Sequence, residues 1–269
     1  NDEKVEGQEL GIKSRLFDRQ LSLNIASYHT KYTNIQVGAS ERGPSGAVLS
    51  RTINAAGAKI YGFEIDATYE PQSIQGLRLN GSVNYNHARY GSFKNAPCGG
   101  GQSAPQGCNQ VLNPATGRFT AQDLSGKPLS RAPSWTGTFG FDYERPVGND
   151  MAVSVGSSVS FMSKYYTNII TFNTPGFTQD KFAKLNLNLA LKGPNDSWEV
   201  AVIGTNITNK YTAGYCFNSN IQGVAFFGGT INGGPAQGAA GDEEATCIVD
   251  RGRSVLLRVT LRPLEFLRK

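Results

Sequence analysis

The segment from Leu77 to Asn86 reads LRLNGSVNYN, in which apolar and polar side chains alternate along almost the whole length. Successive side chains of a β-strand point to opposite faces, so a strand of this kind has one apolar face and one polar face. Residues 184–192, which read KLNLNLALK, repeat the alternation more cleanly. Both segments therefore predict amphipathic β-strands.

Nine such segments lie along the chain, and the connections between them alternate in length. Short turns follow the first, third, fifth and seventh segments, and longer loops follow the second, fourth, sixth and eighth. Two loops, about residues 91–130 and 209–250, each have about 40 residues. The third segment is irregular around Gly57. The predicted strands cover about residues 5–17, 20–37, 49–70, 77–90, 132–145, 151–166, 184–192, 198–208 and 251–263.

Soluble sheets seldom have tight turns at one end of every hairpin and long loops at the other. Combined with polar-in, apolar-out strands of about ten residues, this asymmetry is the signature of an outer-membrane β-barrel. We therefore expect an all-β, antiparallel transmembrane β-barrel fragment of about nine strands. Its short turns would be periplasmic and its long loops extracellular, and outer-membrane lipid would cover its apolar face.

The composition agrees with a barrel that has a wet interior. Hydrophobic residues make up 39% of the 269 residues, fewer than a packed globular domain needs. No stretch approaches the roughly 18 consecutive apolar residues of a membrane-spanning helix. The net charge of +5 comes from scattered lysines and arginines, so the sequence predicts no nucleic-acid partner.

The four cysteines, Cys98, Cys108, Cys216 and Cys247, all lie in the two long loops. Four cysteines allow three pairings. Two fall in each loop, which favours the pairs Cys98–Cys108 and Cys216–Cys247, each stabilising its loop by roughly 2–4 kcal/mol. Such bonds indicate an oxidising compartment. No Cys-x-x-Cys spacing occurs, so we expect no metal site.

Aromatic side chains recur near the ends of the predicted strands. Amphipathic rings settle at the headgroup level of a membrane, so these residues predict an aromatic girdle. The alternative is that they are ordinary core aromatics of a β-sandwich. The residues are Tyr61, Tyr69, Tyr90, Trp135, Tyr143 and Trp198.

Four segments together resemble the C-terminal half of TonB-dependent outer-membrane receptors. Residues 54–65 resemble that family's strand with a Gly-x-Glu core, and residues 129–135 are similar to its leucine-then-proline approach to a strand. Residues 198–211 resemble its Asn-Leu-x-Asp-x-x-Tyr signature before the last extracellular loop, and Gly252-Arg253-Ser254 stands before the final strand. Their order and spacing extend the resemblance over essentially the whole chain.

The resemblance implies a 22-stranded barrel closed by an N-terminal plug, which binds a scarce ligand and is pulled by an inner-membrane complex. The sequence has no plug and begins at Asn1 without a signal peptide. An outer-membrane protein needs an export signal at synthesis, so we expect that it was removed or that the chain is part of a longer protein. We expect residues 1–269 to be the C-terminal portion of such a barrel.

Ligand contacts in such a receptor would come from the extracellular rim and the loops. Phe226 and Phe227 stand in a polar, glycine-rich loop, where an exposed apolar pair indicates contact with a partner, although packing beneath the loop explains them equally well. Glu64, Asp66 and Glu70 would line the lumen or simply be solvated there. The candidate ligand-binding residues are Arg51, Asn84, Asn86, Arg89, Tyr166, Asn168, Asn186, Phe226 and Phe227.

No catalytic constellation is present, because His29 and His87 have no nucleophile or carboxylate at a motif spacing. We expect His87 at the rim or in the lumen, and we expect no enzyme activity and no cofactor. The foremost hypothesis is energy-coupled uptake of a scarce, bulky nutrient, above all a ferric siderophore or related chelate, with the TonB complex as partner. The alternatives are a passive outer-membrane channel, a barrel-anchored adhesin and a soluble β-sandwich that binds carbohydrate.

Overall fold

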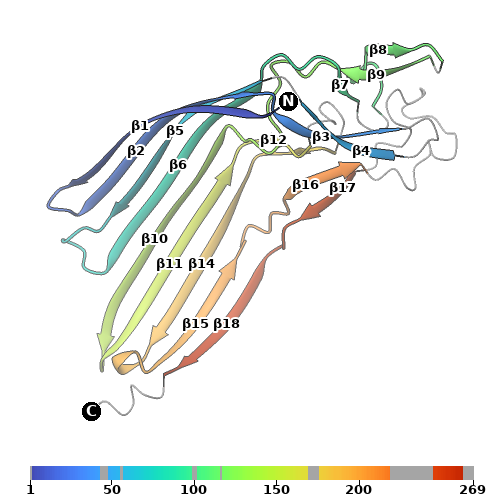
Figure 1. Cartoon of the computed structure of the whole chain (residues 1–269). Helices are drawn as coiled ribbons and strands as arrows, with labels where there is room; N and C mark the ends of the chain where they lie inside the picture. Colours follow the sequence, from blue (N-terminus) through green and yellow to red (C-terminus); the bar gives the residue numbers. More distant parts are fainter. Residues whose placement is uncertain are drawn as a thin grey trace.

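The main feature of this computed structural model is an antiparallel nine-stranded sheet. The structure describes residues 2–42, 48–54, 57–98, 102–115, 117–168, 176–218 and 245–262. Its strands follow the order β1-β2-β5-β6-β10-β11-β14-β15-β18, so each pairs with its neighbour in this series. Figure 1 shows a curved, open sheet with short turns at the lower left and long loops at the upper right. The strands are β1 (Lys4–Leu16), β2 (Leu21–Thr33), β5 (Ala58–Tyr69), β6 (Leu77–Tyr90), β10 (Trp135–Gly148), β11 (Met151–Met162), β14 (Phe182–Lys192), β15 (Trp198–Thr205) and β18 (Ser254–Leu261).

The two faces of the sheet differ as the alternation predicts. On the polar face Glu64 of β5 lies opposite Asn84 of β6, and on the apolar face Phe63 lies opposite Tyr85. The register of β6 with β10 continues both rows into the next strand. Since a shift of one residue would exchange the faces, the alternation and the register must agree. The predicted all-β antiparallel arrangement is confirmed.

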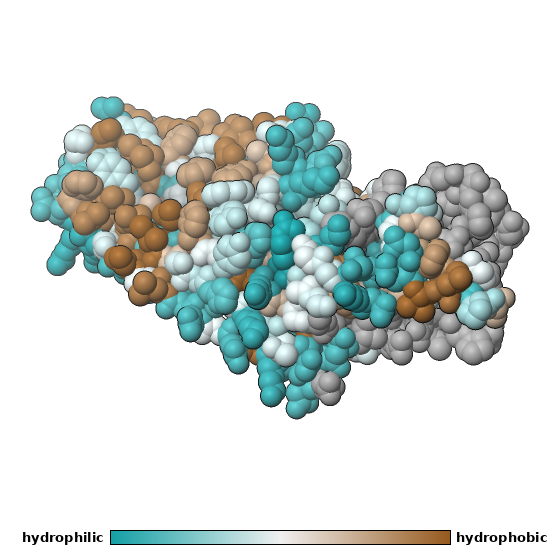
Figure 2. Space-filling model, turned by 90° about the horizontal axis from the view of Figure 1, so that it is seen from above, coloured by the Kyte–Doolittle hydropathy of each residue, from teal (hydrophilic) through white to brown (hydrophobic). Residues whose placement is uncertain are grey.

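No second layer of the described chain covers the apolar face. Leu187, Leu189 and Leu257 are 44%, 53% and 64% exposed. Figure 2 shows hydrophobic side chains gathered over the strands at the left of the view and mainly hydrophilic ones through its middle. A β-sandwich would bury this face against another sheet, so the soluble alternative does not fit the described residues. In the same part of the chain no helix has the length and apolar character needed to cross a membrane.

The short connections are tight turns with left-handed backbone. In the β10–β11 turn, Asn149 and Asp150 have φ values of 51° and 57°. Positive φ at both central residues is the type I′ geometry, whose twist matches that of the flanking strands. Asparagine and aspartate tolerate this conformation better than most residues, which explains why they occur there.

The predicted third strand, residues 49–70, is in fact two strands. β4 (Val48–Asn54) pairs with β3 (Gln36–Arg42) in a separate hairpin, and β5 begins at Ala58. The irregularity expected at Gly57 therefore marks a break in the strand rather than a bulge within it. The hairpin extends the sheet's second and third strands into the region of the long loops (Figure 1).

Close backbone contact explains the glycine at this break. A β-carbon on Gly57 would lie 2.5 Å from the carbonyl oxygen of Tyr32, so any larger residue would push β2 away. The second strand also ends earlier than predicted, at Thr33 rather than near residue 37. Asn34 follows with a φ of 56°, which turns the chain out of the sheet.

The long loops contain structure that the sequence did not predict. β7 (Ala96–Pro97), β9 (Arg118–Gln122) and β8 (Gln110–Asn113) form a three-stranded sheet within the loop after β6. β12 (Tyr165–Tyr166) pairs with β13 (Thr178–Gln179), and β16 (Ala213–Asn218) pairs with β17 (Ala245–Val249). The loops are therefore partly folded units.

A buried apolar cluster lies beneath the first long loop, at the loop end of β6. It contains Tyr90, Phe93, Ala96 and Leu124, of which Tyr90 is 5% exposed. The assignment of Tyr90 to the aromatic girdle is therefore wrong. Its position in β6 places it on the polar face, where the loop covers it.

The other five predicted girdle aromatics lie on the apolar face, as the register of their strands shows. His87 also lies on this face, where its ring stacks on Tyr61 with the ring centroids 4.5 Å apart. It is therefore not a lumen residue.

Candidate ligand-binding site

Two connected hollows lie on the polar face of the sheet. The upper hollow, about 500 Å³, is near the long loops, and the lower hollow, about 320 Å³, is further along β5, β6, β10 and β11. Asn84, Thr136 and Met162 line both. Because these shared residues lie on neighbouring strands, the two hollows form one continuous depression on the polar face.

The floor of the upper hollow depends on a contact between Tyr28 and Gly62. The Tyr28 hydroxyl group lies 3.3 Å from the Tyr85 carbonyl oxygen and 3.3 Å from the Asn86 side-chain oxygen. A β-carbon on Gly62 would lie 2.7 Å from that hydroxyl oxygen. The glycine of the Gly-x-Glu motif therefore leaves room for the tyrosine ring to lie across the strand.

The glutamate of the same motif orients the residue that the two hollows share. The Asn84 side-chain amide donates to the Glu64 carboxylate over 2.7 Å. Glu64 and Asp66 both line the lower hollow, which makes its surface acidic. Ser82, Thr138 and other hydroxyl groups add to that lining, together with apolar side chains such as Phe161. The lower hollow thus offers two carboxylates, which only accept when ionised, beside hydroxyl groups that can donate or accept.

The upper hollow is bounded on another side by the segment that leads into β10. Arg131, Ala132 and Pro133 line it. Arg131 has a φ of 56°, and its backbone N–H donates to the Tyr166 carbonyl oxygen over 2.7 Å. A residue with a side chain adopts this conformation at a cost, so the surrounding structure must hold it.

Tyr165 connects the upper hollow to the final long loop. It lines the hollow together with Gly214, and its hydroxyl group donates to the Ala213 carbonyl oxygen over 2.8 Å. Burial raises the pKa of this hydroxyl group, the charge of Asp250 raises it further, and the charge of Arg131 opposes both. The phenol therefore stays protonated and keeps its role as donor.

Asn206 anchors the start of the final long loop. It is 3% exposed, and its side-chain amide donates to the carbonyl oxygens of Lys210 and Arg251 over 2.9 and 3.1 Å. Its side-chain oxygen accepts from the Lys210 backbone N–H over 3.0 Å. Asn206 stands at the first position of the segment that resembles the family's Asn-Leu-x-Asp-x-x-Tyr signature, and it ties the two ends of the loop together.

An ion pair anchors the end of the same loop. Lys184 of β14 donates to the Asp250 carboxylate over 2.7 Å, and the Thr212 hydroxyl group donates to the same carboxylate over 2.7 Å. These hydrogen bonds, first that from Lys184, hold the pKa of Asp250 below its ordinary value. The carboxylate is therefore ionised at neutral pH.

Of the residues predicted from the sequence, Asn84 and Asn86 lie in the upper hollow. Arg89 does not share their face, since it is at an odd-numbered position of β6, and its guanidinium donates to the Gly126 carbonyl oxygen over 3.0 Å. Arg51 lies in β4, where its backbone is opposite Ala39. Phe226 and Phe227 are outside the described residues.

The other predicted residues support the loops. Asn168 is buried and its side-chain amide donates to the Cys216 carbonyl oxygen over 3.1 Å. Tyr166 packs against the buried cluster beneath the first loop. The Asn186 side-chain oxygen accepts a hydrogen bond from the Asn206 backbone N–H over 2.9 Å. The structure gives each of these side chains a partner within the protein.

Sequence reasoning missed Tyr28, Arg131 and Tyr165 among the residues that line the upper hollow. The alternation places Tyr28 on the polar face of its strand, and this was the available signal. Arg131 lies in the irregular segment before β10, and Tyr165 lies in the two-residue strand β12 beyond the end of β11, where no sustained alternation predicts the direction of a side chain. Only the fold of the loops brings these two next to the rim.

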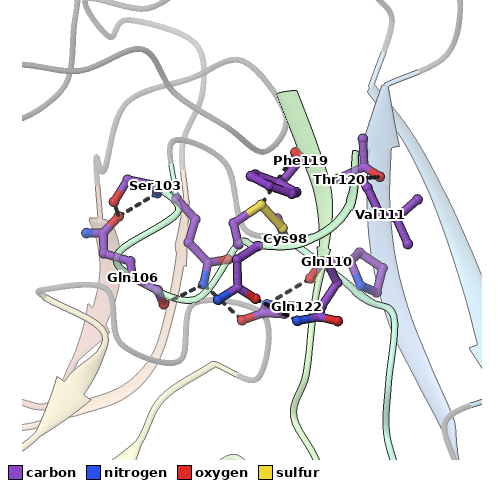
Figure 3. Close-up of a disulfide and its surroundings, with 12 residues drawn as sticks. Cys98, Ser103, Gln106, Gln110, Val111, Phe119, Thr120 and Gln122 are labelled. Atoms are coloured by element: carbon purple, nitrogen blue, oxygen red, sulfur yellow. Dashed lines mark hydrogen bonds between the residues drawn. A yellow bond between two sulfur atoms is a disulfide. The ribbon is translucent and has the colours of Figure 1, made fainter. Parts of the chain in front are cut away.

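The two disulfides join Cys98 to Cys108 and Cys216 to Cys247. Figure 3 shows the first bond beside β9, near Gln122. The Gln122 side-chain amide donates to the Pro97 carbonyl oxygen over 2.8 Å, which fixes β9 against the segment that carries Cys98. The bonds lie within separate loops, so each restrains one loop only.

Comparison with known proteins agrees with this architecture. Residues 1–209 match the profile of the family described as "TonB dependent receptor-like, beta-barrel". Comparison of the sequence with curated proteins finds no significant match.

Solved structures show the same fold. The ferric yersiniabactin uptake receptor FyuA from Yersinia pestis is 13% identical, with a TM-score of 0.61 over 96% of this chain and 29% of its own. The siderophore receptor PiuA from Acinetobacter baumannii is 15% identical, with a TM-score of 0.59 over 95% and 28%. The copper transporter OprC is 14% identical, with a TM-score of 0.53 over 96% and 31%. The chain thus spans less than a third of the length of these proteins.

Proposed function

Because the chain belongs to the TonB-dependent receptor β-barrel family, whose profile matches residues 1–209, we propose that it forms the C-terminal portion of a barrel that imports a scarce, bulky nutrient. Proteins of this family are outer-membrane transporters and not enzymes. The nutrient that we propose is a ferric siderophore or a related metal chelate.

The observation that carries this proposal is the upper hollow. It lies on the polar face at the long-loop end, and its lining of hydroxyl, amide and guanidinium groups can bind a polar ligand from outside the cell. The similar structures support a metal chelate, since FyuA is a ferric yersiniabactin uptake receptor and PiuA a siderophore receptor. OprC, a copper transporter, widens the proposal to chelates of other scarce metals.

We propose that a plug domain of roughly 100–150 residues precedes residue 1 in the complete protein and couples it to the inner-membrane TonB complex. A complete barrel of 22 strands would have a lumen wide enough to leak, so it would need a plug. A passive channel or an adhesin would have no plug, so the coding sequence upstream of residue 1 separates these functions. A start codon and signal peptide directly before residue 1 would contradict the receptor function.

The direct test is uptake of ⁵⁵Fe-labelled chelates by cells of the native host. We expect deletion of the complete receptor gene to abolish uptake of at least one chelate, and deletion of the TonB protein to abolish it equally. The control is the receptor gene restored on a plasmid. Uptake that continues without TonB would instead indicate a passive channel.

A further inference from the structure

Arg131 supplies the only charged group among the described residues that line the upper hollow. The others in this lining are neutral, and they include Tyr28, Asn86 and Tyr165. A single cation in a lining of hydroxyl and amide groups is a natural site for a negatively charged oxygen. A guanidinium is well suited to this role, because its planar fork can donate two parallel hydrogen bonds.

Arg131 differs from the basic residues that pair with acidic partners. In the described part of the chain, no carboxylate lies within ion-pair distance of its guanidinium. The paired residues are Arg78 with Glu70, Lys184 with Asp250, Lys192 with Glu144 and Arg258 with Glu199. Among the residues that line the upper hollow, Arg131 is therefore a cation with no acidic partner in the described part of the chain.

The backbone holds Arg131 in a fixed place. Its φ of 56° is unfavourable for a residue with a side chain. The hydrogen bond that its backbone N–H donates to the Tyr166 carbonyl oxygen maintains this conformation. Pro133 follows two residues later and restricts the conformation of Ala132. Tyr166 is itself packed against the buried cluster beneath the first loop. Strained residues held in this way often mark functional positions.

We propose that Arg131 binds a negatively charged oxygen of the ligand, so that the upper hollow selects an anionic chelate. This inference rests on the proposed transport function and adds the charge of the ligand to it. Glu64 and Asp66 in the lower hollow repel the same charge. The ligand therefore binds with its anionic group at Arg131 and its less negative side toward the lumen.

The test compares ligands that differ in charge. The probes are the anionic ferric tris-catecholate and the uncharged ferric tris-hydroxamate of similar size, titrated into the complete receptor in detergent. The variants are Arg131→Ala and Arg131→Lys. The matched control is Lys164→Ala, which removes the same charge from an exposed residue at the same end of the sheet but outside the lining of the hollow.

We expect the wild type to bind the anionic probe more tightly than the uncharged one. Loss of a charge-assisted hydrogen bond in Arg131→Ala should weaken binding of the anionic probe by about 10-fold to 100-fold and leave binding of the uncharged probe within a factor of about two. Arg131→Lys should bind the anionic probe with an affinity between those of the wild type and Arg131→Ala. Lysine keeps the positive charge but lacks the planar guanidinium that donates two parallel hydrogen bonds. Raising the salt concentration should weaken anionic binding in the wild type more than in Arg131→Ala.

Equal losses for both probes in Arg131→Ala, or unchanged binding of the anionic probe, would overturn the inference. Failure of the wild type to bind the anionic probe, or equal affinity for both probes, would overturn it as well. TonB-dependent uptake of an uncharged chelate would leave the transport function intact and refute only the charge selection. A heat-dependent shift in gel mobility, as folded barrels show, confirms that each variant is folded.

Discussion

At the scale of single residues, family motifs have local physical roles that the structure explains. Gly62 makes room for the Tyr28 ring, and Glu64 orients Asn84, so the Gly-x-Glu core shapes both hollows. Asn206 likewise connects the two ends of the final long loop. These residues act through neighbouring groups, and we regard them as positioning residues.

We predict that Gly62→Ala reduces both stability and ligand affinity. A β-carbon at this position overlaps the Tyr85 carbonyl group and the Tyr28 hydroxyl group, so the strands must shift, at a cost of about 1–3 kcal/mol. Urea-induced unfolding of the complete receptor in lipid vesicles measures the loss. The matched control is Gly7→Ala, where the added carbon would make an ordinary 3.6 Å contact with Thr30. Equal stability of the two variants would refute the role of Gly62.

We predict that the attachment of the final loop weakens in acid. The pKa of Asp250 is lowered in the folded protein, so its contribution is present above the unfolded value of about 3.9 and is lost as the pH falls through the lower folded value. Hydrogen exchange of residues 206–216 in the wild type and in Asp250→Asn tests this. The variant should exchange faster at pH 5 to 7, and the two rates should approach each other only as the pH falls below about 3.9. A ratio that does not change with pH would contradict the role of the ion pair.

At the scale of elements, the long loops are small folded units attached to a regular sheet. The loop after β6 has its own three strands, a disulfide and a buried cluster, and the final loop has a disulfide-linked hairpin. The loop between β11 and β14 contacts both of them, since Tyr166 packs against the cluster of the first loop and Tyr165 donates to the Ala213 carbonyl oxygen of the final loop. The rim of the hollow is therefore held by three connected loops.

We predict that the double change Cys98→Ser and Cys108→Ser destabilises only the first long loop. Removal of a cross-link that closes about 11 residues should cost roughly 3 kcal/mol of local stability. Protease cleavage between residues 91 and 130 should increase, while the barrel keeps its heat-dependent gel mobility. The matched variant, Cys216→Ser with Cys247→Ser, should expose the final loop instead. Cleavage of both loops in either variant would show that the disulfides do not act separately.

At the scale of the whole molecule, the described sheet has two open edges. β1 and β18 each pair with one strand only among the described residues. Unpaired backbone groups cannot be satisfied inside a bilayer, so both edges must meet further strands in the membrane. This agrees with the chain's coverage of less than a third of the similar receptors.

We predict that residues 1–269 produced alone do not form a stable barrel in lipid vesicles. The two open edges should lead to aggregation, whereas the complete receptor should insert and show heat-dependent gel mobility. Because both proteins contain the same nine strands, strand sequence alone cannot account for the difference. Insertion of the isolated chain with full protease resistance would show that these strands close on themselves.

The amino-acid pattern alone was enough to establish the strands, their two faces, the short-turn and long-loop ends and the family. Alternation has a period of two residues, and each such strand has its own apolar face, so the strands and their faces can be recognised locally. The family was indicated by the resemblance of four segments to its motifs. The break at Gly57, the burial of Tyr90 and the sheet within the first loop depended on contacts between distant segments. The same is true of Arg131 at the hollow, because the direction of a side chain in an irregular loop follows from packing and not from periodicity.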